Sequence, residues 1–214
     1  MSYNLVMNTI NYLKETYGYG TPIFIKDIRI GGKSKSSIRK DLSRGVEKGL
    51  IVRKGQGIYC FKEEDSFVDG VTFEEILNKK YIKNDYGLPG LNIDVYGYIS
   101  GLSFLNQIGI SQQVPAVIDI VTNNTSCKRL FKLKNRVAIL RKGKITINRF
   151  NYKALQFFDL FYYLDSEEVR ENRKILVNYI QKNLTKVDFE RYINLYPTKT
   201  IKLIVKEGFV DVFR

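Results

Sequence analysis

The chain has 214 residues, and 35 Lys and Arg against 22 Asp and Glu give it a formal net charge of +13. It contains no histidine and only two cysteines, which excludes Ser-His-Asp and Cys-His catalysis and argues against a zinc site. No apolar stretch approaches about 18 residues and no secretory leader pattern is present, so we expect a cytoplasmic protein with free thiols and no membrane-spanning helix.

Two helices are predicted at the start of the chain. Apolar residues at helical spacing predict the first over residues 4–16, and glycines follow it as they often follow helices. A short second helix is expected over residues 22–28, because Thr21 is a suitable N-cap and Pro22 a suitable first-turn residue. The apolar residues that follow Pro22 would supply its packing contacts.

The next segment has a narrow apolar stripe. Ile38, Leu42 and Val46 recur every four residues and predict a third helix over residues 34–48, with this stripe facing the core. Gly45 lies beside the stripe, where a small residue lets another helix approach closely.

A β-hairpin is expected directly after these helices. Residues 50–53 and 58–61 read as its strands, and residues 54–57 as its turn. Three helices followed by a hairpin predict a winged helix-turn-helix domain over residues 1–62. This segment holds 12 Lys and Arg and 4 Asp and Glu, so it has most of the excess positive charge. Such an excess favours a polyanionic partner, most often nucleic acid.

The composition of the chain changes after residue 62. Residues 63–71 are acidic and polar and are predicted to be a linker. A helix is expected over residues 72–83, because Thr72 and Glu75 have the spacing of a capping box. We therefore predict a second, C-terminal domain over residues 72–214.

The C-terminal domain is expected to mix strands and helices. The expected strands are residues 116–123, 129–134, 136–141 and 144–150, with Lys142-Gly143 as a hairpin turn. The expected helices are residues 98–108, a buried segment 154–164, residues 167–183 capped by Asp165 or Ser166, one after Thr185, and one from Pro197 or Thr198. The predicted fold class is α+β, with a winged helix-turn-helix followed by a mixed α/β domain that ends in a helical segment.

The segment Gly32-Lys33-Ser34 looks like the end of a nucleotide-binding P-loop. A P-loop needs another glycine five residues before Gly32, which lets the backbone turn its N–H groups onto the phosphates. Residue 27 is aspartate instead, and its charge would repel phosphate. The nucleotide-binding interpretation of this loop is therefore rejected.

A DNA-reading helix explains the same segment. With Ile38 facing the core, the opposite face of the third helix consists of Ser, Lys and Arg, which can reach base edges and phosphates. The hairpin would contact the DNA backbone or minor groove as a wing. The predicted DNA-binding residues are Lys33, Lys35, Ser36, Ser37, Arg39, Lys40, Ser43 and Arg44 on the helix side, and Arg53, Lys54 and Gln56 on the wing. No catalytic residue, metal ligand or cofactor is expected.

One stretch, residues 96–124, resembles the AbiEi family, the antitoxins of type IV toxin–antitoxin and abortive-infection systems. The residues that match the family pattern are Gly97, Tyr98, Ser100, Gly101, Ser103, Leu105, Asn106, Gly109, Gln113, Val114 and Pro115. The end of the predicted wing also resembles the family. The likeness covers both halves, is strongest over residues 34–61 and 96–124, and thins out after about residue 150.

The resemblance implies a specific function. Proteins of this family repress their own operon through the winged helix, usually at inverted repeats in double-stranded DNA. Their C-terminal domain counteracts a nucleotidyltransferase-like toxin, to which the antitoxin need not bind directly. No catalytic role comes with the resemblance.

Two alternatives stay open at this point. The first is a stand-alone winged-helix transcriptional regulator whose C-terminal domain senses a ligand or mediates dimerisation. The second is an enzyme acting on nucleic acid, for which Asp119, Asp159 and Asp165 are the only carboxylates we could nominate. Their spacing does not suggest a metal pair, and strand or helix-cap positions explain them better, so we expect no enzymatic activity.

Overall fold

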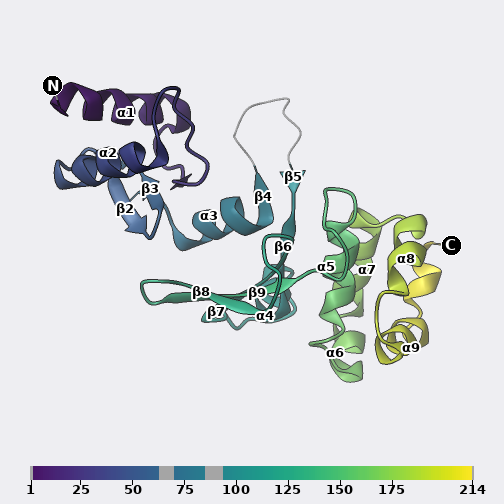
Figure 1. The fold of residues 1–214 in the computed structure, drawn as a ribbon. Coiled ribbons are helices and arrows are strands. Elements are labelled where there is room, and N and C mark those ends of the chain that lie inside the picture. The colour runs from purple at the N-terminus through teal and green to yellow at the C-terminus, as the bar shows by residue number, and fades with distance from the viewer. Residues whose placement is uncertain (1, 63–69, 85–93, 214) are drawn as a thin grey trace. The chain divides into compact units, whose positions relative to one another are not determined.

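The computed structural model describes residues 2–62, 70–84 and 94–213, without the side chains of residues 2–7. Helices and strands both contribute, which confirms the predicted α+β class (Figure 1). The chain divides into two compact units, Met1–Lys79 and Lys80–Arg214. Most of the predicted linker lies outside the described residues.

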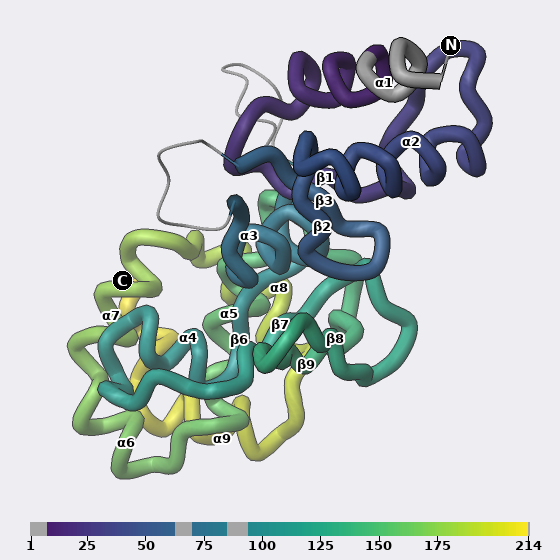
Figure 2. Tube along the Cα trace, turned by 90° about the vertical axis from the view of Figure 1, so that its left-hand side faces the viewer, coloured from purple at the N-terminus to yellow at the C-terminus, as the bar shows by residue number. Residues whose placement is uncertain are grey.

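The first unit joins two long helices to a small sheet. Its elements are α1 (Ser2–Tyr17), β1 (Ile23–Phe24), α2 (Lys35–Glu47), β2 (Val52–Gly55), β3 (Ile58–Cys60) and α3 (Phe73–Leu77). The three strands pair antiparallel in the order β1-β3-β2. Helices α1 and α2 lie side by side (Figures 1 and 2). A Cβ added to Gly45 would lie 2.7 Å from Cδ1 of Ile10, so this glycine permits the close helix approach expected from the sequence.

The predicted third helix is confirmed as α2. Ser34 is its N-cap, and Ile38 and Leu42 of the apolar stripe are buried in the core beside Leu13 of α1. Val46, at the end of the stripe, is only half-buried.

The short helix expected over residues 22–28 is wrong. Ile23 and Phe24 form β1 instead and pair with β3, and a turn follows them. Both side chains are buried, Ile23 completely. The prediction used only the neighbouring Thr21 and Pro22. The strand that pairs with Ile23 and Phe24 lies more than thirty residues later in the chain.

The hairpin is confirmed, with a turn of two residues instead of the predicted four. Strands β2 and β3 are joined by Gln56 and Gly57, and Gly57 has a φ of 67°, which a two-residue hairpin turn favours. Lys54 sits where the register of β2 against β3 shifts. Residues 50 and 51 are not part of β2, and Ile51 is buried in the core instead.

The predicted capping box at Thr72 is also confirmed. The Thr72 hydroxyl accepts from the Glu75 backbone N–H at 3.2 Å, and the Glu75 carboxylate accepts from the Thr72 backbone N–H at 2.7 Å. The predicted helix over residues 72–83 is shorter and less regular, because α3 gives way to a π-helical turn at Asn78–Ile82.

The second unit consists of a four-stranded mixed sheet and a group of helices. The sheet contains β6 (Gly97–Ser100), β7 (Val117–Thr122), β9 (Arg136–Lys142) and β8 (Arg129–Leu133), in that order, and only β7 and β9 are parallel among these pairs. A separate pair is formed by β4 (Lys83–Asn84) and β5 (Asp94–Val95). The helices are α4 (Gly101–Gln107), α5 (Tyr152–Leu160), α6 (Ser166–Glu171), α7 (Arg173–Asn183), α8 (Lys186–Ile193) and α9 (Thr198–Lys206), and a 3-10 turn follows at Phe209–Phe213.

Three expectations for this unit are corrected. Residues 98–100 belong to β6, so α4 starts later than the predicted helix over 98–108. Residues 144–150 form no strand, so Lys142-Gly143 is not a hairpin turn. The single helix expected over 167–183 is broken at Asn172 into α6 and α7.

The remaining helix expectations hold. Asp165 caps α6 and Thr185 caps α8, each in a capping box, and Pro197 precedes α9. Helix α5 is buried as predicted, but it ends at Leu160, and Tyr162 in the rest of the expected buried segment is 44% exposed. The helix places Phe157 and Phe158 in an aromatic core with side chains of α7 and α8.

The stretch that carries the family resemblance builds the junction of β6 and α4. A Cβ on Gly97 would collide with the Tyr81 carbonyl oxygen and lie 2.8 Å from that of Val121. Gly101 has a φ of 61°, and an added Cβ would lie 2.8 Å from the Asp119 carboxylate. Gly97 is therefore required by backbone packing at this junction, and Gly101 by its positive φ and by the Asp119 side chain beside it.

The substitution Gly97→Ala is expected to destabilise the protein by about 3 kcal/mol, because two backbone carbonyls cannot move as a flexible side chain can. Gly109→Ala is the matched control, since Gly109 has a φ of 80° but open space around it, and should cost only about 1 kcal/mol. Urea unfolding followed by circular dichroism measures both. Equal costs for the two variants would contradict the packing role of Gly97.

Candidate nucleic-acid interface

Helix α2 presents a polar N-terminus to solvent. The Ser34 hydroxyl accepts from the Ser37 backbone N–H at 3.2 Å, and the first turn contains no acidic residue. Gly31 and Gly32, which lead into the helix, are exposed and have no neighbouring atoms where a Cβ would sit. The positive end of the helix dipole is therefore open to an anion.

The outer face of α2 is made of the predicted residue types. Its inner face is Ile38, Asp41, Leu42 and Gly45, all buried. The predicted residues that are exposed are Lys35, Ser36, Arg39, Lys40, Ser43 and Arg44 on α2, with Arg53 and Gln56 on the hairpin. Lys33, Ser37 and Lys54 are half-buried.

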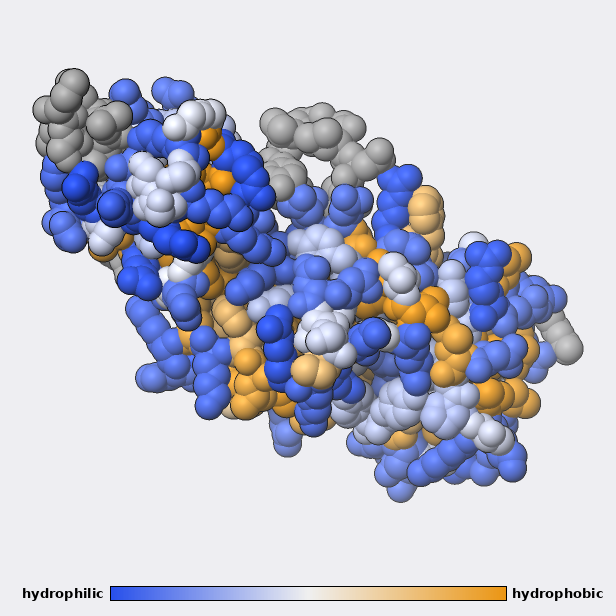
Figure 3. Space-filling view, in the orientation of Figure 1, coloured by the Kyte–Doolittle hydropathy of each residue, from blue (hydrophilic) through white to orange (hydrophobic). Residues whose placement is uncertain are grey.

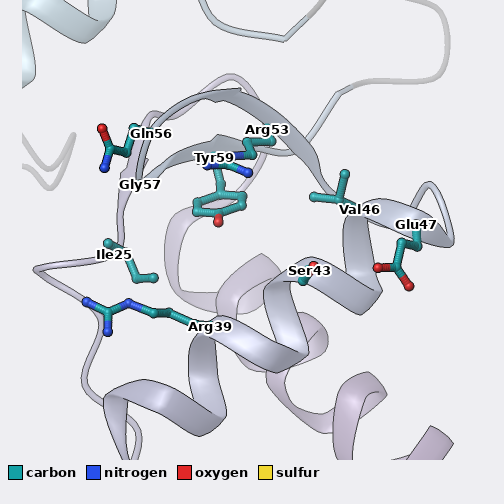
Figure 4. A pocket seen from close by; sticks show the side chains of 9 residues that line it. All are labelled: Ile25, Arg39, Ser43, Val46, Glu47, Arg53, Gln56, Gly57 and Tyr59. Carbon is teal, nitrogen blue, oxygen red and sulfur yellow. The ribbon is translucent and has the colours of Figure 1, made fainter.

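A cleft of about 540 Å³ separates α2 from the β2–β3 hairpin (Figure 4). It brings four predicted residues together, Arg39 and Ser43 from α2 and Arg53 and Gln56 from the hairpin. The remaining predicted residues do not line it. Two parts of the chain that were predicted separately thus share one concave, cationic surface.

Figure 4 shows how the cleft is arranged. The Tyr59 ring reaches from β3 toward α2, between Arg53 and Ser43, and Arg39 extends along one end toward Ile25. Glu47 lies at the other end, away from Arg39, and points outward. The positive charge is therefore concentrated at the end of the cleft nearest the turn of the hairpin.

Five lining residues were not among the predicted contacts: Ile25, Val46, Glu47, Gly57 and Tyr59. Val46 and Glu47 lie two helical turns after Arg39, so helical periodicity places them near the same face of α2 and could have predicted them. Ile25 and Tyr59 lie beside α2 only because of the tertiary fold, and no sequence pattern predicted this.

Lys33 lies apart from the other predicted contacts. Its ammonium is 2.7 Å from the Asp41 carboxylate and donates to the Thr9 hydroxyl at 2.5 Å. The Thr9 hydroxyl in turn donates to Asp41 at 2.6 Å. This triad of Thr9, Lys33 and Asp41 ties α1 to α2, so the Lys33 charge is engaged inside the unit.

The pKa of the Asp41 carboxyl reflects this triad. Burial by itself raises that pKa, but hydrogen bonds from Lys33 and Thr9, with the charges of Lys33 and Arg44, bring it below its ordinary value of 3.8. The ionised form of Asp41 is therefore the one that the folded unit stabilises.

The surface of the first unit is mainly hydrophilic. Hydrophilic residues dominate the visible face of the first unit in Figure 3.

No helix in the described part of the chain is both long and apolar enough to cross a membrane. The described Cys, Asp and Glu side chains form no group of three placed to hold a metal ion.

Neither the protein-family models nor the curated proteins contain a match to this chain.

The substitution Asp41→Asn is expected to lower the free energy of unfolding at neutral pH by about 1–3 kcal/mol, because it leaves the Lys33 ammonium beside an uncharged amide. Glu47→Gln removes a carboxylate from the exposed side of the same helix and should change it by less than about 0.5 kcal/mol. Urea unfolding of the full chain measures both. Equal stabilities of Asp41→Asn and wild type would contradict a stabilising triad.

The stability that the Asp41 carboxylate contributes is expected to depend on pH. A lowered carboxyl pKa contributes stability that is fully present above the ordinary value of 3.8 and is lost as pH falls through the lowered value. The difference between wild type and Asp41→Asn should therefore be constant at neutral pH and shrink as the pH falls below 3.8.

Proposed function

We propose that this chain is a DNA-binding transcriptional autorepressor and the antitoxin of a type IV toxin–antitoxin system. The observation that supports the DNA-binding half is the cleft between α2 and the β2–β3 hairpin, with cations on both of its sides. It belongs to the segment that has most of the chain's excess positive charge. A concave cationic surface of this kind complements the phosphates of a duplex.

In this proposal residues 1–62 form a winged helix-turn-helix. Helix α2 is the recognition helix, and the β2–β3 hairpin is the wing. Strand β1 and the turn after it stand where a second helix would precede the recognition helix, so the arrangement is a variant of the motif.

Helix α2 and the β2–β3 hairpin would make different contacts with the DNA. The exposed Ser36, Arg39, Lys40 and Ser43 would face base edges and phosphates in the major groove, with the open N-terminus of α2 beside the backbone. Arg53 and Gln56 would contact the neighbouring backbone or minor groove. The preferred target would be double-stranded DNA with inverted repeats upstream of the chain's own gene.

The antitoxin half of the proposal rests on the motif over residues 97–115 and its resemblance to the AbiEi family. The C-terminal domain, residues 72–214 after a linker over 63–71, would counteract a nucleotidyltransferase-like toxin without necessarily binding it. A cytoplasmic location fits both roles. It also fits the two cysteines, which are free thiols, Cys60 buried and Cys127 exposed.

A second candidate is a stand-alone winged-helix regulator whose second unit senses a ligand. A cleft of about 250 Å³ in that unit favours it, because a regulator of this type needs a ligand site distinct from its DNA-binding surface.

For DNA binding, Arg39→Ala and Lys40→Ala are each expected to weaken affinity for the DNA upstream of the gene by about tenfold, about 1.4 kcal/mol. Both side chains are exposed on α2 and would lose a contact to a base or a phosphate. Fluorescence anisotropy with labelled duplex at one salt concentration measures the effect. Lys199→Ala, at an exposed position of α9, is the charge-matched control and should stay within about twofold. Wild-type affinity of a variant combining Ser36→Ala, Arg39→Ala and Lys40→Ala would refute the interface.

For the antitoxin role, co-expression with the product of the adjacent gene is the direct test. That product alone should arrest growth, and the full-length chain should restore it. Rescue by the Arg39→Ala, Lys40→Ala double variant would show that the antitoxin role is separate from DNA binding. If the neighbouring product is harmless, or if the chain gives no rescue, the stand-alone regulator is the better description.

A further inference from the structure

The second unit buries a carboxylate among hydroxyl groups. Asp159 lies on α5, with 7% of its surface exposed. One of its oxygens accepts from the Tyr98 hydroxyl at 3.0 Å and the Ser100 hydroxyl at 3.3 Å, and the other accepts from the Tyr196 hydroxyl at 3.0 Å. These groups come from β6, α5 and the segment before α9, so only the tertiary fold assembles them.

An arginine adjoins this cluster from β9. The Arg141 guanidinium lies 3.2 Å from the Asp119 carboxylate and donates to the Tyr163 hydroxyl at 2.5 Å. It also donates to the Ser100 hydroxyl at 3.4 Å, so Ser100 joins the arginine to the Asp159 group. Asp119 and Asp159, forty residues apart in the sequence, thus belong to one polar network.

This network faces a cleft of about 250 Å³. Tyr98, Arg141 and Asp159 line its inner part, and Lys142, Lys144 and Tyr162 line its solvent-exposed part. The Lys144 ammonium lies 4.9 Å from the Tyr196 ring centroid and 5.5 Å from that of Tyr162. Tyr162 itself is 44% exposed. The buried Val121 also lines the cleft, which therefore has a cationic, aromatic opening and a floor of polar groups beside one apolar side chain.

Packing alone does not require such a floor. The same sheet fills its core with Ile120 from β7 and with Ala138 and Leu140 from β9, all completely buried. Apolar residues stabilise a core at least as well as a buried ionic network, which costs desolvation energy. Burial raises the pKa of Asp159, although hydrogen bonds from Tyr98 and Tyr196 and the charge of Arg141 oppose that rise. A ligand that uses these polar groups would account for their placement.

We propose that this cleft is a nucleotide-binding site. The exposed Lys142 and Lys144 supply the attraction for a phosphate beside Arg141, which is paired with Asp119, and the half-exposed Tyr162 ring offers a face on which a base can stack. Asp159 and the Tyr98 hydroxyl lie at the floor, within reach of a polar base edge or a ribose hydroxyl.

The size of the cleft limits the ligand to a single nucleotide unit. Clefts for drug-sized molecules measure about 300–1,000 Å³, and this one is slightly smaller. The exposed positions of Lys142 and Lys144 leave its opening accessible, so the nucleotide is either free in solution or the unpaired end of a nucleic-acid strand. This inference is independent of DNA binding by the first unit.

Isothermal titration calorimetry of the full chain with the four ribonucleoside monophosphates tests the site. We expect saturable binding of at least one of them, weakened at least about tenfold by Lys142→Ala, since a charge-assisted contact to phosphate is lost. Lys132→Ala, an exposed lysine on β8 outside the cleft, is the matched control and should stay within about twofold. Neither substitution removes a buried side chain, so both proteins should fold.

A second arm identifies the source of the nucleotide. It uses a short single-stranded RNA with a 5′-phosphate and a protein background of Arg39→Ala and Lys40→Ala, which removes the proposed DNA-binding contacts. Binding of the RNA alone, lost on Lys142→Ala, assigns the site to strand ends. Failure of every monophosphate and of the RNA to bind at millimolar concentration overturns the proposal. Equal losses from Lys142→Ala and Lys132→Ala overturn it as well, because they indicate unspecific attraction to a basic protein.

Discussion

The orientation of α2 about its own axis is the constraint on which the first unit depends. Ile38 and Leu42 bury their apolar side chains on one side of the helix. Asp41 lies on the same side and is only 5% exposed, so its carboxylate needs hydrogen-bonding partners on α1 and in the loop before α2. Lys33 and Thr9 provide them. With that side fixed, Arg39 and Ser43 turn toward the hairpin, while Lys40 and Arg44 stay in solvent outside the cleft.

Each unit buries an acidic side chain, but the surroundings differ. Asp41 meets a lysine within its own unit, and this pairing joins α1 to α2. Asp159 is held by tyrosine and serine hydroxyls at the floor of a cleft, with three cations lining the same cleft. In the first arrangement the lysine of the same unit neutralises the aspartate. The second leaves positive charge and an aromatic face available to a ligand, and this contrast is the physical reason for treating the two sites differently.

Local signals gave reliable predictions wherever the governing interaction is also local. The capping box at Thr72 and the caps at Asp165 and Thr185 were predicted from short-range hydrogen-bonding residues, and the apolar stripe of α2 was predicted from its period. Predictions failed where a distant strand decided the outcome. Ile23 and Phe24 became β1 by pairing with β3, and residues 98–100 became β6 by pairing with β7.

The sequence by itself determined the α+β class, the charge excess of the first 62 residues, the helix α2 with its polar face, and the hairpin that follows. These features depend on composition, periodicity and turn chemistry, which are written in neighbouring residues. Only the tertiary structure decided that Arg39 and Ser43 share a cleft with Arg53 and Gln56, and that Lys33 is engaged with Asp41. It alone joined Asp119 to Asp159 through Arg141 and Ser100, because such contacts follow from strand pairing and helix packing between segments far apart in the chain.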